Sequence, residues 1–240
     1  VFVFANTGRE RDETLDFVNE CDKRWGLNVV WVEAEIQTYG VGTTHKIVTY
    51  ETASRDGEPF EKMLDKFGIP NMAFPHCSRE LKLRPIHSYV KSLGWTEYDT
   101  AIGIRIDERH RVGKTPEFVY PLVDYGIDKR TVNEWWQNQP FTLQLAEYEG
   151  NCKLCFKKSD KKLVKAINER PEDLEWVKRM EAKHSGQTHG KRSEKIEPSY
   201  FFRGNRSAVE MEELAREAAK QPSLFAALSE DEKDCFCKTT

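Results

Sequence analysis

The sequence has no long apolar run and little imbalance of charge, and both absences narrow the class of protein. No stretch is long and apolar enough to span a bilayer, and no signal peptide is recognisable. Lys and Arg number 37 against 40 Asp and Glu, so the net charge is −3. A charge this small gives no sign of nucleic-acid binding by the whole chain, so any anion site must be local.

Cysteine is also scarce, with six in 240 residues. That number is too small for a disulfide scaffold. Without a secretion signal we expect a cytoplasmic, reducing environment, in which paired cysteines are more often metal ligands or redox groups than structural disulfides. The sequence begins at Val1, directly on an apolar stretch, and from this we expect a further N-terminal segment to precede it.

The pattern of residues 1–150 predicts an α/β domain. Continuous apolar stretches indicate buried strands at 1–6 and 28–35, and an amphipathic helix between them ends at Gly26. Further helices are expected at 58–68, 79–94 and 128–139, further strands at 98–104 and within 118–126, and a loop at 35–57. Apolar strands separated by helices predict a Rossmann-like open, mostly parallel sheet with helices on both faces.

Residues 151–240 have a different pattern, with polar helices in place of apolar strands. Two polar helices separated at Pro171 are expected first, then a polar connector, then an amphipathic helix with Ser207 as its N-cap. We therefore divide the chain into an α/β domain, 1–150, and a helical C-terminal region, 151–240. The segments described next lead us to expect that the first binds an adenine nucleotide and that the second carries a cysteine metal site.

Ligands of an open parallel sheet bind outside the carboxyl ends of its strands, and the first such segment is ANTGRERDET. Gly8 allows a close backbone approach there, and the helix that follows offers free N–H groups to an anion. The alternative is a simple glycine turn before a capped helix.

Two more segments carry cations at predicted strand ends or helix starts. GIRIDERHRVGK places Arg105, Arg109 and Arg111 in one loop, where their guanidinium groups suit phosphate oxygens unless they pair internally. HCSRELKLRP places Arg79 and Lys82 on one helix face just after Cys77, which is otherwise a buried residue at a helix start. Together the three segments predict a site for a nucleotide or a similar polyanion.

The cysteines form two close pairs, Cys152/Cys155 in GNCKLCF and Cys235/Cys237 near the last residue. Four thiols are enough to hold Zn²⁺ or an iron–sulfur cluster, and Cys77 is a fifth ligand candidate. In the rival interpretation the tail carries a redox thiol that visits the active site.

Six segments, taken in order, resemble the phosphoadenosine phosphosulfate reductase family within the PP-loop, or adenine-nucleotide α-hydrolase, superfamily, in particular its phage-borne reductase-like proteins. They are FANTGRERDETLDFV, HCSRELKLRPI, GIRIDERHRV, YPLVDYGIDKRTVNEWW, GNCKLCFKKS and the terminal CFC. The resemblance implies a five-stranded, mostly parallel sheet. It also implies a phosphate-binding PP-loop that would precede residue 1.

The resemblance also implies roles for individual residues. The residues expected to line an adenine nucleotide, either ATP or phosphoadenosine phosphosulfate, are Thr7, Gly8, Gly103, Arg105, Arg109 and Arg111. Arg79 and Lys82 match basic positions that face a sulfate or phosphate. Cys77, Cys152 and Cys155 fall where a [4Fe–4S] cluster is bound, with zinc as the alternative metal. We assign Cys235 as the fourth ligand and Cys237 as the reactive thiol, although their spacing leaves the two roles interchangeable.

Two reactions stay open, because the tail lacks the ECG-x-H motif of sulfonucleotide reductases and a single cysteine precedes SRELK. One is sulfonucleotide reduction, which requires a thiol reductant as partner. The other is ATP-dependent sulfur transfer to an acceptor, which could be a nucleic acid. A contrasting hypothesis is a non-catalytic, metal-stapled protein that binds a nucleotide or another partner.

Overall fold

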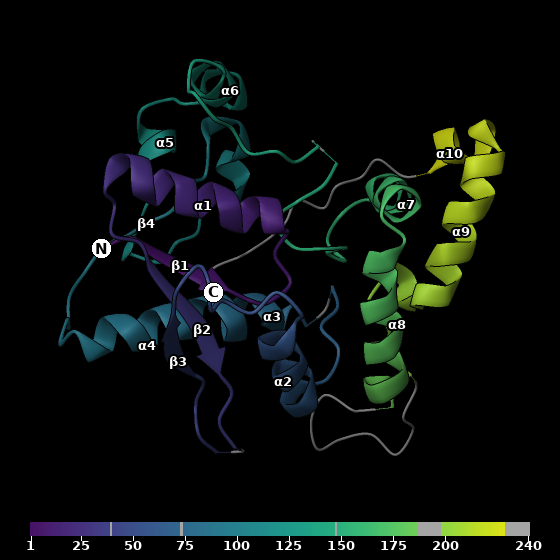
Figure 1. Cartoon of the computed structure of the whole chain (residues 1–240), viewed down its shortest axis with the longest axis horizontal. Helices are drawn as coiled ribbons and strands as arrows, with labels where there is room; N and C mark the ends of the chain where they lie inside the picture. The colour runs from purple at the N-terminus through teal and green to yellow at the C-terminus, as the bar shows by residue number, and fades with distance from the viewer. Residues whose placement is uncertain (39, 73, 147, 187–197, 229–240) are drawn as a thin grey trace.

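A parallel β-α-β unit begins the fold in the computed structural model of the chain (Figure 1). Strand β1 (Val3–Asn6) pairs in parallel with β2 (Val30–Glu35), and helix α1 (Asp12–Trp25) connects them. Gly26 ends α1 in the left-handed conformation, with a φ of 57°, as the sequence predicts. The structure describes residues 1–240 except 39, 73, 147, 187–197 and 229–240.

The region predicted as a loop, 35–57, contains a strand. β3 (Thr44–Val48) pairs antiparallel with β2 and completes a three-stranded sheet in the order β1-β2-β3. Apolar periodicity did not reveal β3 because it is an edge strand with Ile47 60% exposed, so its apolar residues do not mark one buried face. The loop prediction is therefore wrong over these residues.

Helices cover both faces of this sheet, as predicted. Successive residues of β2 point to opposite faces. Trp31 packs with Leu15 of α1 on one face, and Val32 packs with Tyr89 and Val90 of α4 (Arg84–Ser92) on the other. In Figure 1, α1 and α4 accordingly lie on opposite sides of β1 and β2.

A second, smaller sheet pairs β4 (Thr100–Ala101) in parallel with β5 (Phe118–Val119). The strand predicted at 98–104 thus shortens to two residues. In the described part of the chain the five strands form two sheets, of three and two strands. The chain is therefore a mixed α/β protein, and β3 departs from the mostly parallel arrangement expected.

Residues 79–94 begin irregularly. The first turns form a π-helix, η1 (Arg79–Leu83), and regular α-helix follows in α4. Pro85 lies in the first turn of α4, where a missing N–H is tolerated. Leu83 and Arg84 keep helical backbone angles, so the helix changes type there and the predicted break near Pro85 is wrong. The same stretch is preceded by α2 (Glu58–Phe67) and α3 (His76–Ser78).

Short helices follow the second sheet. They are η2 (Ile106–Arg111), α5 (Pro121–Asp124) and α6 (Lys129–Gln137). The Asp128 carboxylate accepts a hydrogen bond from the Thr131 N–H, which confirms Asp128 as the N-cap of α6.

The helices of the C-terminal region lie together at one side of the molecule (Figure 1). They are α7 (Asp160–Glu169), α8 (Glu172–His184), η3 (Arg203–Asn205), α9 (Ala208–Lys220) and α10 (Pro222–Ala227). Ser207 is the N-cap of α9 and Pro171 precedes α8, both as predicted. Glu210 completes a reciprocal capping box with Ser207.

The largest apolar core crosses the proposed boundary at residue 150. It joins Leu64 and Leu81 of the α/β part to Leu163 and Met211 of the C-terminal helices. The ring of Phe60 in α2 also meets Trp176 of α8 with centroids 5.4 Å apart. The two-part division stays a prediction, but the two parts share this core. Among the described residues, no helix is both long and apolar enough to cross a membrane.

Candidate functional site

The loop after β1 pairs with the first cysteine pair. The Arg11 N–H donates to the Asn151 carbonyl at 2.6 Å, and the Lys153 N–H donates to the Arg9 carbonyl at 2.8 Å. Glu10 and Cys152 lie directly opposite each other in this antiparallel bridge. Residues opposite each other in an antiparallel pair project their side chains to the same face. Two segments separated by more than 140 residues in sequence thus form one site.

Glu10 occupies the centre of this site, although no sequence pattern singled it out. Its carboxylate is 1% exposed and accepts hydrogen bonds from the Thr7 N–H at 2.8 Å and the Thr7 hydroxyl at 2.7 Å. The Lys82 Nζ lies 3.4 Å from the other carboxylate oxygen. Thr7 and Lys82, predicted as nucleotide and oxyanion ligands, are therefore brought together by a buried carboxylate.

The glycine turn of this loop is closed by its own side chains. Gly8 has a φ of 76°, and a Cβ there would lie 2.9 Å from Pro59, so the position requires glycine. The Gly8 N–H donates to the Asn6 side chain at 3.2 Å, and the Arg9 N–H donates to the Thr7 hydroxyl at 3.2 Å. An anion that binds these two N–H groups must displace the Asn6 and Thr7 side chains.

Cys152 is a thiol at neutral pH. Burial raises the pKa of Cys152 from the ordinary 9.0 to about 12, and Glu10 adds to this effect. Lys82 and Arg9 act in the opposite direction, and Cys77 of α3 is a further electrostatic neighbour. A free Cys152 is consequently a poor nucleophile, and metal ligation would have to remove its proton.

Three of the four predicted metal ligands lie on two neighbouring segments, α3 and residues 150–158. Cys77 interacts electrostatically with Cys152, and both Cys152 and Cys155 interact with Lys158. The Lys157 Nζ also donates to the Ser78 hydroxyl at 3.4 Å, which ties the two segments together. Thiol ligands are those that Zn²⁺ and iron–sulfur clusters prefer.

The described residues do not complete a metal site. Across residues 1–228, leaving aside the gaps named above, no three or more His, Cys, Asp or Glu side chains group closely enough to hold a metal ion. Cys235 and Cys237, the proposed fourth ligand and reactive thiol, lie outside the described residues. The cysteine metal site stays a prediction.

Lys158 has the most unusual environment at the site. Its Nζ is buried and has no hydrogen-bond partner among the described residues. Burial lowers the pKa of Lys158, while the neighbouring Cys155 and Cys152 act to raise it. The Lys158 side chain crosses Gly150, where an added Cβ would lie 3.3 Å from Nζ.

Arg79 and Lys82 each pair with a buried carboxylate and still reach solvent. The Arg79 Nε donates to Glu80 at 2.9 Å, and the two side chains are 54% and 0% exposed. Glu80 also accepts hydrogen bonds from the Thr43 hydroxyl at 2.6 Å and from Arg84 at 3.1 Å. π-Helical turns such as η1 often occur at functional sites. The arrangement orients both cations while leaving part of each accessible to an oxyanion.

The Arg105 segment has a different arrangement. Arg105 pairs with Asp107 at 3.0 Å and with Glu108 at 3.2 Å, and Arg111 pairs with the same Glu108. Arg109 and Gly103 are exposed. These ion pairs match the alternative of an internally paired charge run.

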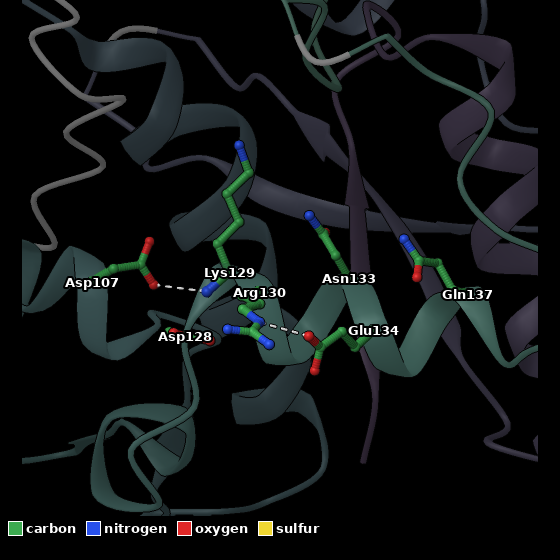
Figure 2. Close-up of a pocket in the computed structure, with 7 residues that line it drawn as sticks. All are labelled: Asp107, Asp128, Lys129, Arg130, Asn133, Glu134 and Gln137. Carbon is green, nitrogen blue, oxygen red and sulfur yellow. Dashed lines mark hydrogen bonds and ion pairs between the residues drawn. The ribbon is translucent and has the colours of Figure 1, made fainter.

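An open hollow beside this segment is shown in Figure 2. Its lining comprises Asp107, Asp128, Lys129, Arg130, Asn133, Glu134 and Gln137. Asp107 accepts a hydrogen bond from the Lys129 N–H at 3.0 Å, and the side chains of Arg130 and Glu134 form an ion pair. The lining residues are all polar or charged, which suits an adenine ring poorly.

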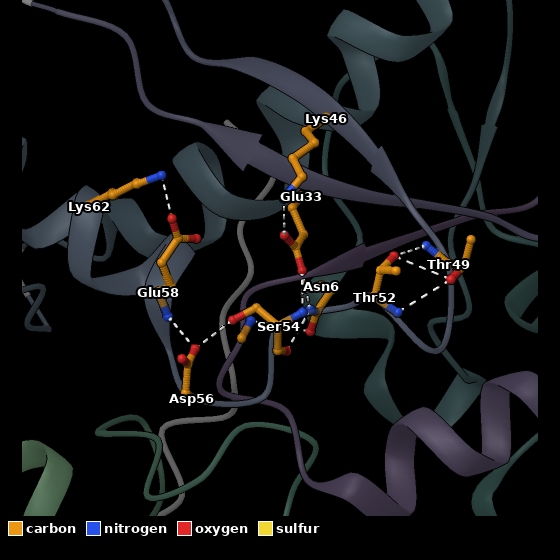
Figure 3. Close-up of polar contacts among 10 residues, drawn as sticks. Asn6, Glu33, Lys46, Thr49, Thr52, Ser54, Asp56, Glu58 and Lys62 are labelled. Carbon is orange, nitrogen blue, oxygen red and sulfur yellow. Dashed lines mark hydrogen bonds and ion pairs between the residues drawn. The ribbon is translucent and has the colours of Figure 1, made fainter.

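A second buried carboxylate organises the ends of β1 and β2 (Figure 3). Glu33 is 2% exposed and accepts hydrogen bonds from the Asn6 amide at 2.7 Å and the Ser54 N–H at 2.6 Å. Asp56 then accepts from the Ser54 hydroxyl at 2.8 Å, and this hydrogen bond lowers the pKa of Asp56. These contacts hold residues 52–58 against the strand ends that carry Thr7 and Gly8.

The chain is similar to a phage protein. It is 33% identical over 168 residues to an uncharacterized nin region protein, ORF290, of Escherichia phage lambda. The match covers 68% of this chain and 58% of the phage protein, so the chain spans less than two thirds of that relative.

Comparisons with protein families and with solved structures identify no further relative. No family model matches the chain, and no solved structure matches it. The phage source of the relative agrees with the phage-type resemblance, but the name of that protein assigns no activity. The likeness to phosphoadenosine phosphosulfate reductases therefore stays a prediction.

Proposed function

We propose that the chain is an adenine-nucleotide-dependent enzyme of sulfur metabolism that resembles phosphoadenosine phosphosulfate reductases. One observation carries the proposal. The bridge between Arg9–Arg11 and Asn151–Lys153 places a strand-end turn, a cation and a cysteine pair at one position. Nucleotide binding at a strand end beside a thiol site is the combination that sulfur transfer from a nucleotide needs.

The two anchored cations support the oxyanion part of the proposal. A sulfate or phosphate group carries its charge on oxygens that Arg binds in pairs and Lys binds as a point charge. Arg79 and Lys82 are held at one end by Glu80 and Glu10, so their orientation is fixed before a ligand arrives.

We also propose that the two small sheets are parts of one larger, Rossmann-like sheet. In the described part of the chain, β1 and β4 each pair along a single edge. Tyr98, just before β4, packs in the same core cluster as Val3 of β1, so the two sheets lie near each other. A further parallel strand between β1 and β4 would join them into one mostly parallel sheet.

Two reactions fit this arrangement. In the first, a cysteine thiolate attacks the sulfur of a sulfonucleotide, an S–S bond forms, and the S–O bond to the phosphate breaks. A dithiol reductant then releases sulfite and becomes a disulfide. In the second, an acceptor oxygen attacks the α-phosphate of ATP, pyrophosphate leaves, and a sulfur nucleophile displaces AMP. The proposed thiol, Cys237, lies outside the described residues.

A [4Fe–4S] cluster, or Zn²⁺, is proposed as the resident metal group of the same site. Cys77, Cys152 and Cys155 would hold it together with Cys235. Two observations fit such a group: the ligands offered are thiols, and the neighbouring Lys158 Nζ is buried without an acceptor. When bound, the group would supply a structural link and a local charge.

The test uses the full-length protein, purified without oxygen. Sulfite release is measured with adenosine phosphosulfate and phosphoadenosine phosphosulfate plus dithiol, and pyrophosphate release is measured with ATP. We expect one product, and we expect Lys82→Gln to reduce its rate at least tenfold, the effect of losing about 1.4 kcal/mol of charged contact. Lys91→Gln, at an exposed lysine of α4, is the matched control. If neither product forms, the enzyme proposal is wrong.

A non-catalytic, metal-stapled nucleotide-binding protein is the second candidate. The internally satisfied turn at Thr7–Arg9 and the paired Arg105 segment favour it. It predicts nucleotide binding without turnover. It also predicts that Cys152→Ser lowers metal content and stability with no activity to lose.

A further inference from the structure

A third cation, Arg84, lies at the junction of η1 and α4, close to the two predicted anion ligands. Its Nη1 donates to the Glu80 Oε2 at 3.1 Å, and its side chain is 42% exposed. The Arg79 Nε donates to the other oxygen of the same carboxylate at 2.9 Å. One fully buried acid therefore fixes two half-exposed guanidinium groups.

The contact with Glu80 leaves both arginines able to bind a ligand. A guanidinium group has five N–H donors, and its contact with one carboxylate oxygen uses only part of them. Since both side chains also reach solvent, they can bind the oxygens of an anion without leaving Glu80. Because the carboxylate already orients them, these side chains lose less conformational entropy when the anion binds.

Glu80 is itself held by a residue from the connection between β2 and β3. The Thr43 hydroxyl donates to the Glu80 Oε2 at 2.6 Å, and Thr43 is buried directly before β3. Lys66 of α2 fastens the preceding turn, because its Nζ donates to the carbonyls of Gln37 at 2.7 Å and Val41 at 2.9 Å. A buried carboxylate that accepts from a hydroxyl and two guanidinium groups has little freedom to turn.

The cations extend along the edge of the sheet where ligands are expected. Lys82 is anchored by Glu10 in the turn after β1. Arg84 is anchored, through Glu80, at the start of β3. β1 and β2 are parallel and β3 is antiparallel to β2, so the ends of β1 and β2 and the start of β3 meet at one edge. Ligands of α/β sheets bind outside the carboxyl ends of the strands, which is this edge.

We propose that Arg84 is a further anion-binding residue of this site, and that Thr43 positions Arg84 and Arg79 through the carboxylate of Glu80. The inference rests on the proposed function and deepens it, because it adds a cation and its support to the oxyanion site. The ligand class is the phosphate or sulfate group of a nucleotide. Arg84 contacts the anion itself, whereas Thr43 acts only through Glu80.

Each contact has its own expected effect on the affinity for adenosine 3′,5′-bisphosphate, measured by calorimetric titration of the full-length protein. Arg84→Gln is expected to weaken binding about tenfold, the effect of one charge-assisted hydrogen bond. Thr43→Val keeps the branched shape, removes the hydroxyl and is expected to weaken binding about three- to tenfold. Thr43→Ser keeps the hydroxyl and is expected to bind within about twofold of the wild-type protein.

The double variant separates positioning from general support of the fold. If Thr43 acts through Arg84 and Arg79, the fold-loss of affinity in the protein with both Thr43→Val and Arg84→Gln is smaller than the product of the two single losses. A residue that only stabilises the fold would multiply the loss caused by Arg84→Gln. Circular dichroism and the thermal midpoint of each variant show that affinities are compared between folded proteins.

Two matched controls carry the same substitutions away from Glu80. Thr44→Val removes a hydroxyl that donates to Glu35 at 3.3 Å, and Arg216→Gln removes an exposed arginine of α9 that pairs with Glu213. Both are expected to bind the bisphosphate as the wild-type protein does. An equal loss of affinity in Arg216→Gln would mean a general charge effect and would overturn the role of Arg84.

The inference and the proposed function fail in different ways. Unchanged affinity in Arg84→Gln, equal affinities of Thr43→Val and Thr43→Ser, or fully multiplied losses in the double variant would overturn the inference and leave the proposed function standing. A wild-type protein that does not bind the bisphosphate would instead refute the nucleotide site, and the inference with it, before any variant is measured.

Discussion

Two segments rich in arginine look alike in the sequence and differ in the structure. Both RELKLR, at 79–84, and RIDERHR, at 105–111, mix basic and acidic residues. The first places the carboxylate of Glu80 at 0% exposure and leaves Arg79 54% exposed. In the second, Asp107 is 40% exposed and Arg105 is 26% exposed. In the first segment the acid is buried while its arginine is exposed. In the second segment neither the acid nor the arginine is buried.

That difference separates a prepared binding surface from an ordinary charged surface. A buried carboxylate must be paired, so it holds its cations firmly and turns them toward solvent. Exposed ion pairs contribute little and are screened by salt. We therefore expect the 79–84 segment to bind anions and the 105–111 segment to behave as a solvated face.

The largest expected effect is on stability. Glu80→Gln should lower the free energy of unfolding by about 2–3 kcal/mol, because it leaves Arg79 and Arg84 without their charged acceptor. Glu108→Gln, the matched change in the second segment, should stay within about 0.5 kcal/mol. Urea unfolding of both variants measures this difference, and equal losses would remove the distinction between the segments.

The next effect is on anion binding. Arg79→Gln should weaken binding of adenosine 3′,5′-bisphosphate about tenfold, as expected for one charge-assisted hydrogen bond. Arg105→Gln should leave it unchanged because that guanidinium already pairs with Asp107 and Glu108. Calorimetric titration of both variants measures their affinities for this nucleotide. A loss of affinity in Arg105→Gln alone would restore the nucleotide role predicted from the sequence for the second segment.

A third effect comes from the Cys152 thiol. The pKa of Cys152 is raised from 9.0 to about 12, so below pH 9 it is protonated in both folded and unfolded chains. As pH rises above 9, the unfolded thiol ionises first, and the metal-free protein should lose about 1 kcal/mol of stability between pH 9 and 10. The Cys152→Ser variant should not show this loss of stability between pH 9 and 10. An unchanged alkaline profile in the variant would contradict the raised pKa.

The smallest effect concerns Asp107. Its pKa is lowered mainly by the Arg105 hydrogen bonds, so its contribution to stability is present above the ordinary value of 3.8 and disappears as pH falls through the lowered value. NMR titration of the Asp107 carboxylate should show this lowered pKa move back toward 3.8 in Arg105→Gln. High salt should reduce the shift, since both side chains reach solvent. A shift that persists in the variant would point to another cause.

Local patterns predicted much of the secondary structure. Asp128 and Ser207 cap their helices through hydrogen bonds to residues three positions ahead, so the signal lies within one turn. β3 escaped prediction because its pairing with β2 is a contact across a loop, and its exposed Ile47 breaks the apolar pattern. The predicted anion segment at Thr7–Gly8 was located correctly as a strand-end turn, yet the acceptors of its N–H groups could not be predicted.

The sequence by itself determined the alternation of strands and helices, the capped helix ends and the cysteine spacing, because each depends on neighbours a few residues apart. The tertiary structure decided that Glu10 faces Cys152, that Lys82 reaches Glu10, and that the Lys158 Nζ is buried without an acceptor among the described residues. These contacts join residues far apart in the chain, and their energetics depend on burial. Burial is a property of the packed fold and has no local signature in a run of charged residues.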